Sequence, residues 1–190
     1  MNLDPKSLVE SLTTKRHKAR QALGILLLIL TVVVSAPQSA SLFVVGTILA
    51  GIGIMIRLWG AGHLKKDKEL AQDGPYAFVR HPLYVGNTLI ITGYLAAAQI
   101  WWLVPIAIAF GLLYYPPAIR KEDAKLRKRF PEQWEAWGTK THALIPKLQP
   151  EGELNIHNWS FSQSLRANGE PIIAAFLILG LVVMGSRIFG

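Results

Sequence analysis

Arg80 and His81 stand side by side in the stretch GPYAFVRHPLYVG, residues 74–86, directly before an apolar run. Pro82 restricts the residue before it to extended backbone and suits the first position of a helix, so we expect a helix to begin at Pro82 or Leu83. Unpaired backbone N–H groups and the positive end of the helix dipole would then lie beside the guanidinium. This combination favours an anion such as a carboxylate. The alternative is that Arg80 contacts lipid phosphates and His81 is an interfacial residue.

A second group with chemical potential is the acidic pair Glu122–Asp123, and Glu122 lies 42 residues after Arg80. Because about 20 residues carry a helix across a bilayer, a helical hairpin would bring Arg80 and Glu122 to the same face at similar depth. A shielded carboxylate there would orient the guanidinium for bidentate capture of a second carboxylate, whereas an exposed pair would be only structural. The preceding residues 114–117, YYPP, predict a broken helix end.

The elements that must position these residues are apolar. Hydrophobic residues make up 51% of the chain and charged residues 17%, below the roughly 25% of soluble domains. Five segments approach the length of a transmembrane helix, the first being marginal: 21–36, 40–60, 83–100, 101–119 and 171–188. A cleaved signal peptide is the alternative for the first, but four further spans follow it. The sequence therefore predicts an all-α integral membrane protein of about five transmembrane helices, forming one domain over residues 1–190.

The basic residues set the expected orientation. The segments 1–20, 61–82 and 120–170 hold five, four and nine of them, eighteen of the twenty Lys and Arg, which places these segments and the N-terminus in the cytoplasm and the C-terminus on the opposite side. The net charge of +8 occurs in short blocks between apolar segments. This pattern indicates membrane lipids as partners and not nucleic acid.

The cytoplasmic segments should hold the site. Without cysteine, the chain has neither a thiolate zinc site nor a cysteine nucleophile, and we expect no metal. Residues 122–141 predict an amphipathic helix at the membrane interface, with Trp134 and Trp137 as anchors. The small residues of 46–62 predict close helix packing, within the chain or across a dimer face. For Arg57, a side chain that reaches the headgroups is favoured over a role with substrate.

The Arg-His-Pro-x-Tyr motif in residues 74–86, followed by EDAKLRKRFPEQWEAW from Glu122, resembles the isoprenylcysteine carboxyl methyltransferase family. That family lies within a wider group of membrane methyltransferases that includes phospholipid N-methyltransferases. The resemblance covers about residues 60–147 and indicates a minimal, prokaryotic-type member located in the cell membrane. The family's Glu-Glu pair is Glu122–Asp123 here, which makes Glu122 the better candidate for the family's functional carboxylate.

The resemblance implies methyl transfer from S-adenosylmethionine to the C-terminal carboxylate of a prenylated cysteine that reaches the site from the bilayer. It places the cofactor and catalytic region at about 61–147, with Arg80 and Glu122 as the catalytic residues, toward the substrate carboxylate. The cofactor would be bound by Lys68, Glu69, Leu70 and Ala71, largely through their backbone, and by Tyr76, His81, Pro82, Leu83 and Tyr84. A carboxylate is already ionised at neutral pH, so its attack on a methyl group needs alignment and no general base.

Other functions stay open. A phospholipid amine methyltransferase would need a base, for which Glu122 or His81 is available. A membrane reductase would need a larger nicotinamide-binding surface than these loops offer. A transporter or scaffold predicts polar residues at the bilayer midplane, where Thr47, Thr88 and Thr92 are the main candidates. His142 either closes over the cofactor or is a solvated loop residue.

Overall fold

The computed structural model describes residues 28–65, 68–151 and 154–190. Its main elements are the helices α2 (Ala40–His63), α3 (Pro82–Ala98), α4 (Val104–Arg129), α5 (Pro131–Gly138), α6 (Phe161–Asn168) and α7 (Glu170–Phe189), and the short 3-10 turns η1 (Gly74–Ala77), η2 (Trp101–Leu103) and η3 (Ile156–Asn158). Residues 28–34 are also helical, and none of the residues described lies in a strand. The prediction of an all-helical chain is confirmed for this part of the molecule.

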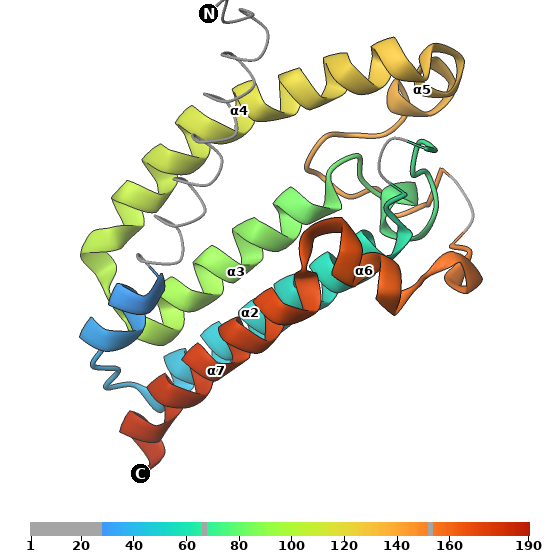
Figure 1. Cartoon of the computed structure of the whole chain (residues 1–190). Helices are drawn as coiled ribbons and strands as arrows, with labels where there is room; N and C mark the ends of the chain where they lie inside the picture. Colours follow the sequence, from blue (N-terminus) through green and yellow to red (C-terminus); the bar gives the residue numbers. More distant parts are fainter. Residues whose placement is uncertain (1–27, 66–67, 152–153) are drawn as a thin grey trace, which may run out of the picture.

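Helices α2, α3 and α7 run side by side, and their buried residues form the larger apolar core (Figure 1). α4 runs antiparallel to α3 and continues into α5 beyond the beginning of α3 (Figure 1). The predicted close packing of the glycine-containing stretch 46–62 is confirmed, with α3 as the partner helix. A Cβ added at Gly46 would lie 2.5 Å from the carbonyl oxygen of Gly93, and one at Gly53 would lie 2.6 Å from that of Gly86. These positions therefore bring the two helix backbones into contact.

Within the part of the chain that the structure describes, three helical segments are long and apolar enough to cross a membrane: Ala40–His63, Trp101–Arg129 and Glu170–Phe189. They correspond to three of the five predicted spans. The predicted span 83–100 becomes α3, which has 17 residues and ends where Gln99 adopts a left-handed backbone conformation (φ 57°). Of the predicted span 21–36, residues 28–34 are helical and residues 21–27 lie outside the described part.

The prediction of a broken helix at residues 114–117 is wrong. α4 passes through Pro116 and Pro117 and continues to Arg129, so the fourth span and the first part of the predicted interfacial helix are one element. Adjacent prolines remove donors within a single turn, and the strong helix formers that follow, such as Lys121, Ala124 and Leu126, sustain the helix beyond them. The interruption comes at Phe130, and Pro131 then begins α5.

The connector after α5 folds back along the segment that precedes α3. The backbone N–H groups of Arg80 and His81 donate to the carbonyls of His142 (2.9 Å) and Ala143 (3.1 Å). Lys147 N–H donates to the carbonyl of Phe78 at 2.9 Å. These backbone bonds hold the Arg-His pair in place from the side opposite its own helix.

Candidate functional site

Arg80 and His81 lie at the N-terminus of α3, as the sequence predicted. His81 is the residue that caps the helix, with extended φ of −125°, and Pro82 occupies its first position. His81 is only 4% exposed and Pro82 is fully buried. The imidazole therefore enters a shielded environment at a helix end.

Asp123 joins the two basic side chains. Its Oδ1 lies 2.8 Å from His81 Nε2, and its Oδ2 accepts a 3.4 Å ion-pair hydrogen bond from Arg80 Nη2. Arg80 was expected to meet Glu122, but its partner is the next residue, because consecutive side chains on a helix point about 100° apart. Glu122 is 47% exposed and lies 3.9 Å from His81 Nδ1. The cluster therefore presents one shielded and one open carboxylate.

The Arg80 guanidinium is also held by the end of α5 and the turn after it. Nη1 donates to the carbonyl of Gly138 at 2.5 Å and to that of Thr141. The guanidinium carbon lies 5.6 Å from the ring centroid of Trp134, within the range of a cation–π contact. Among the described residues, Arg80 Nε is buried and has no hydrogen-bond partner.

Trp134 and Trp137 are not interfacial anchors, which corrects the prediction from the sequence. They are 7% and 4% exposed and pack with Leu70 and Tyr76 in a second apolar cluster beneath α5. Trp137 Nε1 donates to the carbonyl of Tyr76 at 3.2 Å. Their i, i+3 spacing indicated one shared face, but the tertiary partner of that face comes from the distant loop 70–76.

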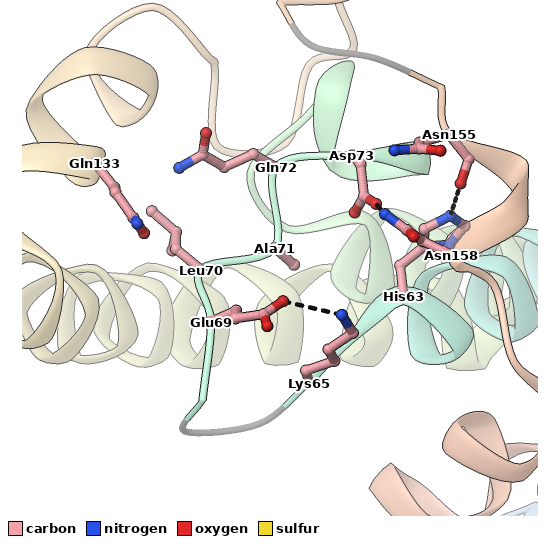
Figure 2. Close-up of a pocket in the computed structure, with 10 residues that line it drawn as sticks. All are labelled: His63, Lys65, Glu69, Leu70, Ala71, Gln72, Asp73, Gln133, Asn155 and Asn158. Carbon is pink, nitrogen blue, oxygen red and sulfur yellow. Dashed lines mark hydrogen bonds and ion pairs between the residues drawn. The ribbon is translucent and has the colours of Figure 1, made fainter.

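The structure separates the predicted cofactor residues into two groups. Glu69, Leu70 and Ala71 line a pocket of about 460 Å³, together with His63, Lys65, Gln72, Asp73, Gln133, Asn155 and Asn158 (Figure 2). Lys68, Tyr76, His81, Pro82, Leu83 and Tyr84 are not among its lining residues. Tyr84 instead makes edge contacts with His81 and with Tyr115 of α4.

Two polar contacts between lining side chains shape this pocket, and one of them comes from Asn158 in the segment before α6. Asn158 Nδ2 donates to Asp73 Oδ2 at 2.8 Å, and Lys65 Nζ pairs with Glu69 Oε2 at 3.0 Å (Figure 2). Gly74 has a left-handed φ of 55°, and a Cβ there would lie 2.7 Å from the His63 ring. A glycine is therefore required where the pocket wall turns toward η1.

Arg57 is the functional candidate whose environment the sequence did not reveal. It was expected to reach the headgroups, but its side chain is 14% exposed and forms an ion pair with Glu170 at 2.5 Å. These residues are 113 positions apart, so no local pattern could have paired them. The His142 side chain is exposed, and its backbone carbonyl supports Arg80. Within the residues described, no group of three or more His, Cys, Asp or Glu is placed to hold a metal ion.

The fold and the site define a membrane-protein class: helices able to cross a bilayer, with an Arg–His–carboxylate cluster at the start of one helix. Residues 19–133 match the family model described as phospholipid methyltransferase. The match covers more than half of the sequence, and the chain belongs to the phospholipid methyltransferase family. That family is part of the wider group of membrane methyltransferases, which also includes the isoprenylcysteine family that the motifs resemble.

Two curated relatives are similar over most of this chain. The nickel-cobalt-cadmium resistance protein NccN of Alcaligenes xylosoxydans xylosoxydans is 38% identical over 133 residues, covering 67% of this chain and 62% of that protein. The cobalt-zinc-cadmium resistance protein CzcN of Cupriavidus metallidurans is 36% identical over 136 residues, covering 68% and 61%. The chain thus spans about three fifths of the length of these relatives. No solved structure matches it significantly.

Proposed function

We propose that this protein transfers a methyl group from S-adenosylmethionine to the C-terminal carboxylate of a prenylated cysteine. The observation that carries the proposal is the Arg80–His81–Asp123 cluster at the start of α3, within the family-matched region. Arg80 Nε is the one guanidinium nitrogen without a partner among the described residues, and because it is buried, an acceptor oxygen reaches it only when a neighbouring side chain moves. The other guanidinium nitrogens are held by the chain itself, which fixes the direction of that donor.

The pocket beside loop 69–73 fits the cofactor. Its volume falls within the range usual for small-molecule sites. Leu70 and Ala71 offer an apolar surface for a purine, and the carboxylates of Glu69 and Asp73 would stabilise a nearby positive charge. When bound, S-adenosylmethionine supplies an electrophilic methyl group on a positively charged sulfur. The residues named here would hold and orient it.

If the acceptor is a carboxylate, the side chains of the cluster need only bind it, orient it and exclude water. Asp123 holds both Arg80 and His81, so neither ring nor guanidinium must reorganise when the acceptor arrives. Trp134 covers the guanidinium and limits the access of water to it. No proton has to be removed, because the acceptor is already ionised.

A phospholipid amine is the second candidate acceptor, and one observation favours it. Glu122 is half exposed and lies 3.9 Å from His81 Nδ1, so an open carboxylate and an imidazole nitrogen face the same place. A carboxylate attracts an ammonium group, and either side chain can accept the proton that an amine must lose before methylation. The family description also concerns phospholipids.

The test uses the full chain purified in detergent, with methyl-labelled S-adenosylmethionine and either farnesylated cysteine or phosphatidylethanolamine in mixed micelles. We expect the label to appear on farnesylated cysteine as a methyl ester. Mild base hydrolyses a methyl ester, so it should release the label as methanol. Base-stable label on phosphatidylethanolamine would select the amine reaction instead. If calorimetry shows no binding of S-adenosylhomocysteine and neither acceptor is labelled, the proposed function is wrong.

A further inference from the structure

Arg57 and Glu170 form a bidentate ion pair between α2 and α7. Arg57 Nε donates to Glu170 Oε2 at 2.9 Å, and Nη2 donates to Oε1 at 2.5 Å. The Glu170 side chain is 2% exposed. Taking two charges out of water is costly, and the remaining donors of a buried guanidinium need partners. The direction in which the third nitrogen of this guanidinium points is therefore informative.

That third nitrogen, Arg57 Nη1, points to α3. It donates to Asn87 Oδ1 at 2.5 Å and makes a longer 3.5 Å contact with the carbonyl of Leu83. Gly86 makes this approach possible, since a Cβ there would lie 2.6 Å from Arg57 Cγ. One guanidinium thus joins three helices, and its contacts on α3 fall in the first two turns after His81.

The same network lies within electrostatic reach of the site. Burial raises the pKa of Tyr76, the carboxylates of Glu122 and Glu170 raise it further, and Arg57 opposes them. Tyr76 is packed under Trp134, which covers Arg80. The network contacts α3 at Leu83 and Asn87, directly after His81 of the Arg–His–carboxylate cluster, so the two adjoin at the start of α3.

Building on the proposed function, we infer that Arg57 is a positioning residue for methyl transfer, and that Glu170 orients it so that it fixes the first turns of α3. These turns follow directly on His81, which with Arg80 and Asp123 forms the proposed acceptor site. α7, which lies beyond the family-matched residues 19–133, thereby belongs to the catalytic unit. A purely structural pair would only attach α7 to α2.

Two variants of the full chain separate these roles. Asn87→Leu removes the acceptor on α3 at similar volume and leaves the ion pair intact. The exchange Arg57→Glu with Glu170→Arg restores opposite charges between α2 and α7 but removes the donors that reach α3. For both we expect the KM for the methyl acceptor to rise about tenfold, as loss of a charge-assisted hydrogen bond implies. Asn87→Leu should also lower the thermal midpoint modestly, because a buried donor of Arg57 loses its partner, whereas the charge exchange should stay closer to the wild type because it restores the ion pair.

A second readout does not depend on activity: hydrogen exchange of backbone amides 84–88 in the purified protein. We expect faster exchange there in both variants. The matched control is Glu135→Gln, which removes an exposed ion pair with Arg127 and should change none of these quantities. The inference is wrong if the charge exchange restores KM along with the thermal midpoint, or if Asn87→Leu changes neither KM nor exchange. If the wild type neither binds nor transfers, the proposed function fails, and the exchange rates alone decide whether Arg57 fixes α3.

Discussion

Replacing Asp123 by Asn tests the site directly, because Asp123 is the only carboxylate that contacts both Arg80 and His81 in the described part of the chain. The substitution keeps the size of the side chain and removes its charge. A hydrogen bond to a charged group contributes about 1.5–3 kcal/mol. The Asp123 side chain is 22% exposed, so solvent screens this contribution only in part. We expect the free energy of unfolding to fall by about 1–3 kcal/mol.

The effect on catalysis should be of the same size, since the two groups that Asp123 orients are those proposed to hold the acceptor. A loss of 1.4 kcal/mol corresponds to about a tenfold change in rate, so kcat/KM should fall by about 10- to 100-fold. The assay is the initial rate of label transfer with each acceptor, beside calorimetry with S-adenosylhomocysteine. Binding of that product should be weakened less than kcat/KM, because Asp123 is not among the residues that line the pocket.

Glu122→Gln is the matched comparison, one residue away on the same helix. Its carboxylate is 47% exposed, lies 3.9 Å from His81 Nδ1 and accepts a hydrogen bond from the Tyr84 hydroxyl, so stability should change by less than about 1 kcal/mol. Suppose that Asp123→Asn leaves kcat/KM within about threefold of the wild type while Glu122→Gln abolishes transfer. The functional carboxylate would then be Glu122, as the sequence suggested, and the reasoning from the Asp123 contacts would be refuted.

Four further substitutions probe the supporting structure. Gly53→Ala should lower the thermal midpoint by an amount equivalent to about 1–3 kcal/mol, because its Cβ would lie 2.6 Å from the backbone of α3. Gly51→Ala, with nothing within 4 Å, should stabilise α2 slightly, and equal effects at both positions would contradict the packing argument. Trp134→Ala should cost about 3–5 kcal/mol in denaturant unfolding, and a cost below about 1 kcal/mol would show that Trp134 is not buried. Because burial raises the pKa of Tyr76, the folded state favours the neutral hydroxyl. The resulting stability is fully present below the unfolded-state pKa of about 10 and is lost as the pH rises above it. Tyr76→Phe should therefore reduce the loss of unfolding free energy between about pH 8 and about pH 11, and an unchanged loss would exclude this role for Tyr76.

Local signals predicted the parts of the site that depend on neighbours in sequence. The start of α3 followed from Pro82, which acts on the residue before it and on its own φ angle. The close packing of α2 followed from glycines at helical spacing. The meeting of Arg80 with the end of the fourth span followed from the length of a hairpin, although that length does not specify which of two adjacent carboxylates faces inward.

Helix phase decided between Glu122 and Asp123, and it depended on whether α4 continues through Pro116 and Pro117. If the helix were broken there, the directions of side chains 122 and 123 would not follow from the orientation of the span. Because α4 is unbroken, the orientation of the span determines which of the two side chains faces Arg80. The sequence pattern around the prolines favoured the break, whereas the preference for Glu122 came from the family's Glu-Glu pair. To predict a side-chain contact at the end of a long helix, one must therefore know whether the whole helix is continuous.

The contacts that no local pattern could supply come from outside the family-matched residues. Glu170 reaches Arg57 from α7, and the connector carbonyls of His142 and Ala143 hold the backbone of Arg80 and His81. The connector has no hydrophobic period, and its hydrogen bonds to the Arg-His pair are made by its backbone. The Arg-His pair is therefore fixed from three directions: by its own helix, by Asp123 of α4 and by this connector. A motif match over α3 and α4 alone would identify Arg80, His81 and Asp123 and omit much of what holds them in place.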